Sequence, residues 1–147
     1  MSEPIPAALV DYMRGLAEHD IPLIGSTFSD GVQFVTPAKT MVKHEILEFL
    51  SALYRGFPDW SYDHDPPSFC DDGSIAVRWR QGGTHTATLE FPGFDAVSAT
   101  GKTVKIPEHD FHYRVHDNQL TEIRPDPVPG GAPRGIFEQI GVQLPPL

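Results

Sequence analysis

Cysteine, basic residues and long apolar segments are all scarce in this sequence of 147 residues. The one cysteine, Cys70, excludes an internal disulfide and a metal site built from several cysteines, and we expect a reducing, cytoplasmic setting. No apolar run approaches the roughly 20 residues that span a bilayer. The N-terminal residues also lack the basic stretch that precedes the apolar part of a signal peptide, so we predict no membrane partner.

The shortage of basic side chains also limits the kinds of molecule that the chain can bind. The chain has 11 lysines and arginines against 20 aspartates and glutamates, which gives a formal net charge of −9. Nucleic acids require a basic face, so we do not expect one as a partner. The sequence has no glycine-rich dinucleotide or phosphate loop and no Gly-x-Ser-x-Gly elbow.

Apolar residues are nevertheless numerous enough for one folded domain, which we predict over residues 1–147. Hydrophobic residues make up 39% of the chain and aromatic residues 10%, which suffices to bury a core at this length. Fifteen prolines and 13 glycines indicate many turns and short elements.

The first half of the chain has helical periodicity. Apolar residues recur every three or four positions over 5–16 and over 43–55, which predicts two amphipathic helices. Between them, a short helix is expected over 20–28, followed by a turn over 29–31 and a short strand over 32–35.

In the second half the period changes to two, which is typical of strands. The alternation predicts strands over 60–64, 74–88, 103–116 and 119–124, and a closing helix over 134–140. This order predicts an α+β fold, in which the N-terminal helices pack on the concave face of a strongly curved, mostly antiparallel sheet. Such a conical barrel has an apolar interior that suits a small hydrophobic molecule.

Several short segments stand in a distinctive order along nearly the whole chain: 56–59 (GFPD), 77–79 (VRW), 83–86 (GTHT), 101–102 (GK), 113–115 (YRV), 120–122 (LTE) and 139–141 (QIG). With the order of elements, they resemble the SnoaL-like polyketide cyclases of the nuclear transport factor 2-like superfamily. The resemblance implies a conical α+β barrel, frequent homodimers and no metal or organic cofactor. It also implies chemistry such as the intramolecular aldol ring closure of a polyketide ester, with an aspartate as the acid–base catalyst.

The position of that aspartate departs from the family pattern. The family residue ends the last strand in a phrase resembling Glu-His-Trp-Asp, whereas here residues 122–126 read EIRPD. Asp126 is the candidate acid–base residue, but it falls one position later than in the family. A shift of one residue along a strand turns a side chain to the opposite face, unless a bulge near Pro125 restores its direction.

Cofactor-free chemistry at carbon requires a base beside a carbonyl group and a donor for the developing oxyanion. His109 alternates in phase with Phe111 and Tyr113 and is predicted to face the interior, as a base, as a proton donor or as a hydrogen-bonded histidine at the rim. His85 is a candidate substrate contact at the mouth, or an exposed strand histidine. Asp110 has the opposite phase and gains a role only if a bulge reverses the faces.

Aromatic residues on the predicted interior faces are candidates for substrate binding, although packing alone also explains aromatic residues there. They are Trp79, Tyr113, Tyr54, Phe111 and Phe34. Arg78 and Arg80 are expected on the outer face, paired by solvent or by an acidic partner subunit.

The seven histidines do not indicate a metal site. His109 lies opposite in strand phase to His112 and His116, so the three cannot converge on one ion, and we predict no metal.

The sequence therefore favours a cofactor-independent enzyme of the cyclase, isomerase or lyase type that uses Asp126 or His109. One alternative is a non-catalytic ligand-binding or dimerisation module of the same fold. A further alternative is an epoxide hydrolase or dehydratase, which requires a carboxylate pair or a His–Asp pair around one buried water.

Overall fold

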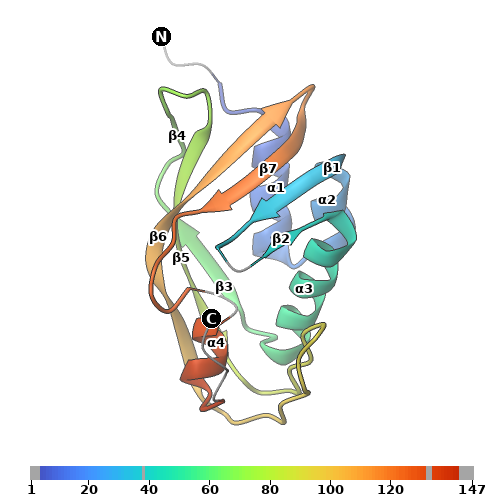
Figure 1. The fold of residues 1–147 in the computed structure, drawn as a ribbon, viewed down its shortest axis with the longest axis vertical. Helices are drawn as coiled ribbons and strands as arrows, with labels where there is room; N and C mark the ends of the chain where they lie inside the picture. Colours follow the sequence, from blue (N-terminus) through green and yellow to red (C-terminus); the bar gives the residue numbers. More distant parts are fainter. Residues whose placement is uncertain (1–3, 38, 132–133, 143–147) are drawn as a thin grey trace.

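The computed structural model describes residues 4–37, 39–131 and 134–142 (Figure 1). In chain order the elements are α1 (Ala7–Glu18), α2 (Ile21–Ser26), β1 (Phe28–Val35), β2 (Thr40–Met41), α3 (Lys43–Gly56), β3 (Ser61–His64), β4 (Ser68–Phe69), β5 (Ile75–Thr84), β6 (Thr103–His116), β7 (Gln119–Pro125) and α4 (Arg134–Gln139). The predicted order of helices, strands and a closing helix is confirmed.

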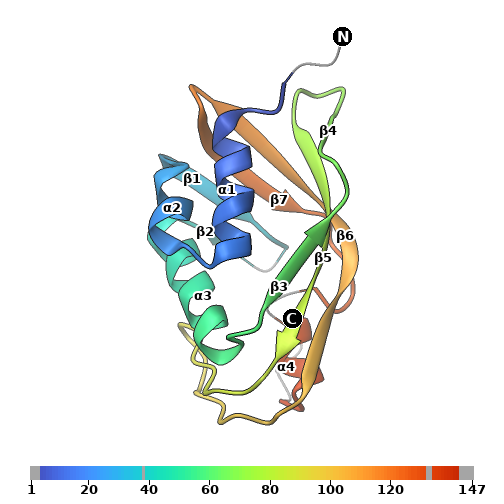
Figure 2. The ribbon, with the colours of Figure 1, turned by 180° about the vertical axis from the view of Figure 1, so that it is seen from behind.

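The strands form one curved sheet in the order β2-β1-β7-β6-β5-β3, and β4 pairs with β5. All pairs are antiparallel except β1 with β7, which are parallel. The sheet is open rather than closed, because β2 and β3 end it on opposite sides. Figure 2 shows α1, α2 and α3 together on one face, where α1 contacts β7 and β3, and α3 contacts β1. The predicted fold class is therefore confirmed.

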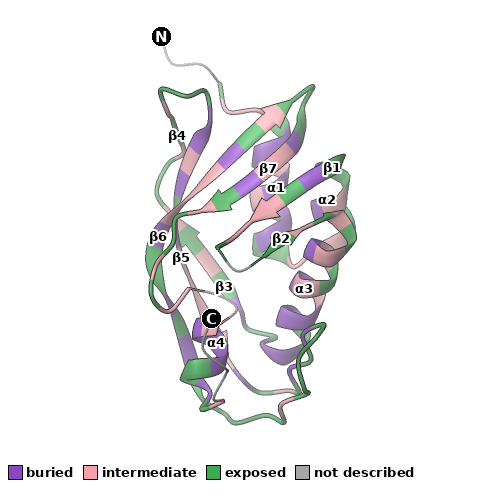
Figure 3. Ribbon diagram, in the orientation of Figure 1, coloured by how far each residue is buried: buried purple, intermediate pink, exposed green. Residues whose placement is uncertain are grey.

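The core lies between these helices and the sheet. The apolar stripe of α1 buries Leu9, Tyr12 and Leu16, and that of α3 buries Ile46 and Leu53. Figure 3 shows buried segments, in purple, along α1, α3 and the strands of the sheet. Each fully buried aliphatic side chain contributes about 1.5–3 kcal/mol, so packing rather than local propensity holds these short helices in place.

Two predicted boundaries are wrong. Residues 29–31 form part of β1 instead of a turn, because β1 gains a partner distant in sequence: Phe28 pairs with Leu120 and Gln33 with Glu122. The strand predicted to end at residue 88 ends at Thr84, because the chain then leaves the sheet toward the end of α3. There the amide of Ala87 donates to the carbonyl oxygen of Gly56.

The outer face of the sheet carries charged pairs formed within the chain. The Arg78 guanidinium lies 2.8 Å from Glu108 and 3.2 Å from Asp110, and Arg80 lies 3.1 Å from both Asp63 and Asp65. Their expected pairing with solvent or a partner subunit is wrong, since cross-strand carboxylates of the same chain supply the partners. Among the described helices, none combines the length and apolar character needed to cross a membrane.

Candidate functional site

A cavity of about 790 Å³ lies between the helices and the concave face of the sheet. Residues of α1, α3, β1, β3, β5 and β6 line it, and the segment 125–131 and α4 complete its wall. Its volume is in the range that holds a drug-sized ligand. Four of the five aromatic residues proposed for binding line this cavity: Trp79, Tyr113, Phe111 and Phe34. Tyr54 does not line it directly.

A bulge in β6 positions His109. Trp79 of β5 pairs with His109, but Gln81 pairs with Ile106, so β6 contains one more residue than β5 over this stretch. The extra residue falls at Pro107–Glu108, where proline supplies no amide hydrogen for the ladder. Beyond the bulge His109, Phe111 and Tyr113 face the cavity, as their alternation predicts.

The tautomer of His109 follows from its partner. The Nδ1 atom lies 2.7 Å from the carbonyl oxygen of Pro107, which can only accept, so Nδ1 carries the proton and donates it. Within the described ranges no hydrogen bond to Nε2 is found. In its neutral form this tautomer carries an unshared electron pair on Nε2. The ring of Phe111 packs against the imidazole, with 4.9 Å between ring centroids.

All four tyrosines of the chain meet beside this cavity, although they come from four different elements. The Trp79 indole nitrogen donates to the Tyr113 hydroxyl at 2.8 Å. The hydroxyls of Tyr54 and Tyr62 lie 2.8 Å apart, and the ring of Tyr12 packs 5.7 Å from that of Tyr113. Tyr54 thus reaches the site through Tyr62, which does line the cavity.

Burial raises the pKa of each of these four tyrosines above the ordinary value of about 10. Neighbouring tyrosines raise the pKa values of Tyr12 and Tyr62 further, because each would repel a second phenolate. The cluster is therefore neutral at physiological pH and consists of hydroxyl groups that can donate hydrogen bonds.

The carboxylate of Asp126 points away from the cavity interior. Pro125 pairs with Phe111, which faces inward, and the amide of Asp126 donates to the carbonyl oxygen of Asp110, which faces outward. The imidazole Nε2 of His112 donates to the Asp126 carboxylate at 3.0 Å on this outer side. Asp126 is exposed and borders the cavity only at its mouth.

The remaining two candidate residues lie outside the cavity wall. Asp110 faces outward and pairs with Arg78, because the bulge in β6 precedes His109 and leaves the phase of Asp110 unchanged. His85 is fully buried and stacks on Phe57, with ring centroids 5.2 Å apart. The alternative of an exposed strand histidine is therefore wrong, whereas contact with a substrate at the mouth stays a prediction.

The hydrogen bonds of His85 indicate a structural role. Both the amide and the hydroxyl of Thr100 donate to its Nδ1, at 3.2 and 2.9 Å. The proton therefore sits on Nε2, which is buried and has no hydrogen-bond partner among the described residues. Burial lowers the pKa of this histidine. His85 thus attaches the segment around Thr100 to the end of β5.

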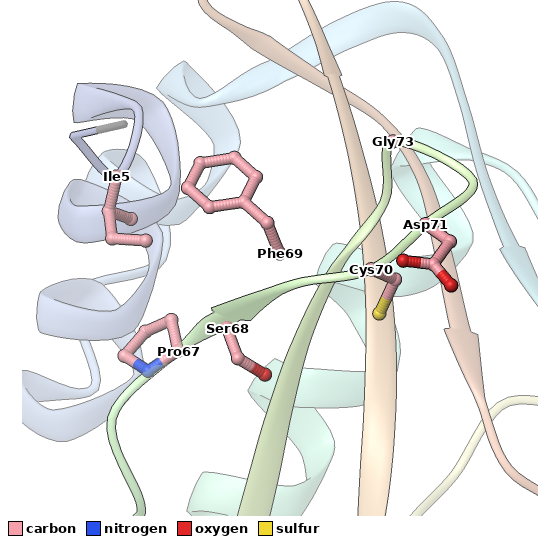
Figure 4. Close-up of a pocket in the computed structure, with 7 residues that line it drawn as sticks. All are labelled: Ile5, Pro67, Ser68, Phe69, Cys70, Asp71 and Gly73. Atoms are coloured by element: carbon pink, nitrogen blue, oxygen red, sulfur yellow. The ribbon is translucent and has the colours of Figure 1, made fainter. Parts of the chain in front are cut away.

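A second hollow lies on the surface between the segment before α1 and the β4–β5 hairpin. Figure 4 shows the ring of Phe69 directed toward Ile5, with Cys70 beside the hairpin turn. This second hollow contains none of the predicted site residues, and the side chain of Phe69 beside it is 40% exposed. In the described part of the chain, no three His, Cys, Asp or Glu side chains are grouped as metal ligands would be.

The sequence reasoning missed Tyr12 and Tyr62 as members of the site. Each carried a recognisable signal, because a tyrosine on an otherwise apolar face brings a hydroxyl that needs a partner. Tyr12 belongs to the apolar stripe of α1, and Tyr62 shares the strand phase of Trp60 and His64.

Comparisons with known proteins agree on the fold. The sequence model of the SnoaL-like domain matches residues 9–123. A structure from Jannaschia sp. CCS1, named as a SnoaL-like polyketide cyclase, is 17% identical and superposes with a TM-score of 0.70 over 98% of this chain and 99% of that one. AclR from Streptomyces galilaeus, named as a hydroxylase, is 18% identical with a TM-score of 0.69 over 92% and 93%.

A further neighbour has been crystallised with a small molecule. TerC with polyporic acid is 16% identical, with a TM-score of 0.63 over 90% of this chain and 95% of that one. At such identities the likeness shows the fold alone. Among curated proteins none matches this sequence.

Proposed function

This chain belongs to the SnoaL-like domain family, and from that premise we propose that it is a small-molecule enzyme of the cyclase, isomerase or lyase type. It acts by acid–base catalysis on a hydrophobic carbonyl compound held in the 790 Å³ cavity. The small molecules named with neighbouring structures, such as polyporic acid with TerC, support a ligand of this size class.

One observation carries the proposal: His109 lines the cavity, and its Nε2 atom has no hydrogen-bond partner among the described residues. Because Nδ1 donates to Pro107, Nε2 is the atom that accepts a proton from a substrate carbon beside a carbonyl group. The electron pair left on the substrate becomes an enolate. In a cyclisation the enolate carbon forms the new carbon–carbon bond, and the resulting alkoxide takes the proton back from Nε2. In an isomerisation the proton returns to another carbon.

Asp126 is the less suitable base on geometry. Its carboxylate is engaged by His112 on the outer side of the sheet. The epoxide hydrolase and dehydratase alternative gains no support either, because this His–Asp pair is half-exposed and encloses no site.

A second candidate, a non-catalytic ligand-binding protein, is favoured by one observation. The two acidic residues that line the cavity, Asp126 and Glu138, are both exposed. Among the residues that the structure describes, the cavity has no interior carboxylate, which suits passive binding of an apolar guest.

Hydrogen–deuterium exchange separates these candidates without knowledge of the full reaction. A panel of β-keto esters is incubated with the protein in deuterated buffer, and proton NMR follows loss of the signal beside the ketone. His109→Asn retains an amide donor for Pro107 but lacks the base, so the catalysed exchange should fall by about 10²-fold or more. His112→Asn, the same change on the outer face of β6, is the matched control and should keep the wild-type rate within about threefold.

Asp126→Asn is measured in parallel, and the wild-type rate is expected there also. Loss of exchange in Asp126→Asn with retention in His109→Asn would reverse the assignment of the base. A wild-type protein that binds the esters without accelerating exchange would overturn the enzymatic proposal in favour of the binding protein.

A further inference from the structure

We propose that residues 86–99 form a strap over one end of the cavity, and that His85 is the latch that holds this strap closed. Protonation of His85 releases the strap and speeds the entry and exit of an uncharged apolar ligand. Two sequence segments of the family resemblance, 56–59 and 83–86, meet at this latch and have no part in the proposed chemistry. The inference concerns access to the cavity and does not depend on the reaction that takes place there.

The strap connects α3 with α4 at the rim of the cavity. Phe94 lines the cavity and is 42% exposed, so it stands at the boundary between the cavity and solvent. The buried ring of Phe91 packs on Phe49 of α3 and on Phe137 of α4, with centroid distances of 4.5 and 5.5 Å. Figures 1 and 2 show this segment, in yellow, beside the C-terminal end of α3. Because Phe49 also lines the cavity, movement of the strap changes the size of the opening.

The strap itself is weakly held. Its internal backbone pairing is the isolated bridge between Leu89 and Val97, with hydrogen bonds of 2.9 and 2.8 Å. Leu89 is fully buried, but residues 92–96 are all exposed. Segments with few buried contacts and an exposed backbone open locally more often than the core of a protein. The contacts at the base of the strap therefore determine how often it opens.

His85 joins the two ends of the strap. Its amide donates to the carbonyl oxygen of Lys102 at 2.9 Å, and its own carbonyl oxygen accepts from the amide of Gly101 at 2.8 Å. Its ring nitrogen Nδ1 accepts from both the amide and the hydroxyl of Thr100. The stack on Phe57 fixes the same ring to the end of α3.

This junction requires a neutral ring with its proton on Nε2. Protonation adds a hydrogen to Nδ1, which then faces the amide hydrogen of Thr100; the hydroxyl can rotate to accept, whereas the amide cannot. It also places a charge on a fully buried ring whose Nε2 has no hydrogen-bond partner among the described residues. Burial accordingly lowers the pKa of His85. Once the strap opens, the ring reaches water and binds a proton near its ordinary pKa of about 6.5, so acidification favours the open strap.

The charged groups on the segments packed against His85 do not offset its protonation. The Asp59 carboxylate, which follows α3, accepts from the amide of Thr84 at 2.7 Å. The other charged residues on these segments are exposed to solvent, namely Arg55, Glu90, Asp95 and Lys102. Among the described residues, none of these groups forms an ion pair with His85.

Hydrogen exchange followed by NMR tests the latch. The amides of Leu89 and Val97 are compared with core amides around Phe111 in β6, after correction for the intrinsic pH dependence of exchange. Strap amides should be less protected than core amides at about pH 7.5, and their opening should increase by up to about tenfold at about pH 5.5. His85→Asn keeps an acceptor at the junction but binds no proton, so it should show no such increase.

Ligand uptake tests whether the strap controls the cavity. N-phenyl-1-naphthylamine stays uncharged over this pH range and fluoresces in apolar surroundings, so its binding is followed by stopped-flow fluorescence. Its association and dissociation rates should both rise on acidification by the same factor as strap opening, and His85→Asn should abolish the rise. His116→Asn changes an 80% exposed histidine at the opposite end of β6, and this matched control should keep the rise.

A second variant covers the case in which His85→Asn does not fold. Thr100→Val removes one of the two donors to Nδ1, so its strap should open more often than the wild-type strap at both pH values. Strap amides that exchange only as fast as core amides, or a rise on acidification that persists in His85→Asn, overturn the latch. Uptake rates that stay constant while the strap opens, or a protein that takes up no probe at either pH, overturn its control of the cavity.

Discussion

Replacing Tyr113 by phenylalanine tests how tightly the site is built, because the change removes one oxygen and leaves the ring in place. The lost oxygen accepts the Trp79 indole N–H at 2.8 Å, and both side chains are at most 3% exposed. The indole N–H of Trp79 can only donate a hydrogen bond, so in Tyr113→Phe it is left buried without an acceptor. That penalty is about 1–3 kcal/mol, which lowers the midpoint of thermal unfolding by roughly 2–12 °C in a chain of this size.

Tyr54→Phe is the matched comparison, since it also removes one hydroxyl from a buried pair. Its partner, the hydroxyl of Tyr62, can rotate toward the cavity and find water, so the cost should stay below about 1 kcal/mol. Circular dichroism follows thermal and urea unfolding of both variants and the wild type. Equal stabilities for the two variants would refute the reasoning, because they would show that the Trp79 nitrogen is not enclosed.

Two other predictions concern the frame around the site. Burial lowers the pKa of His85 in the folded protein, so as the pH falls the unfolded chain binds a proton at this histidine before the folded chain does. The free energy of unfolding is therefore unaffected by His85 above about pH 6.5. Below that pH it falls by up to about 1.4 kcal/mol per pH unit. In urea unfolding at several pH values, His85→Asn, which keeps an acceptor for Thr100, should lack this part of the slope. Gly82→Ala places a Cβ 2.4 Å from the Val104 carbonyl oxygen and should lower the free energy of unfolding by about 1–3 kcal/mol. In Gly31→Ala the new Cβ meets nothing within 4 Å, so that variant should be as stable as the wild type or slightly more stable. Similar urea midpoints for the two variants would contradict the close approach of β5 and β6.

Periodicity predicted best where one face is buried along a whole element. The alternation over 103–116 matches the bounds of β6, and the stripe over 43–55 matches α3 within one residue. The turn predicted at 29–31 failed for the opposite reason. The local Ser-Asp-Gly sequence favours a turn, but pairing of β1 with β7, about 90 residues later, outweighs that preference.

The candidate site, like the fold, could be predicted from the sequence only in part. Alternation was sufficient to place His109, Phe111 and Tyr113 on one face, because they share a strand and a phase. It could not show that the Trp79 indole reaches a hydroxyl 34 positions away, nor that His85 turns into the loop at Thr100. Such contacts depend on register between strands and on where the chain leaves the sheet, which no local pattern encodes.

Register also determines which ionisable group the cavity receives. The bulge at Pro107–Glu108 supplies the carbonyl oxygen that fixes the proton on Nδ1 of His109 and leaves Nε2 toward the cavity. At the end of β7, the later position of Asp126 aligns it with outward-facing Asp110, so its carboxylate meets His112 instead of the interior. In the proposed function, His109 therefore takes the part that the family resemblance implies for an aspartate, and the register of β6 and β7 accounts for the difference. For this chain, likeness of fold is then weak evidence about the catalytic residue, and the direction of each side chain across β6 and β7 is the stronger guide to which variant removes activity.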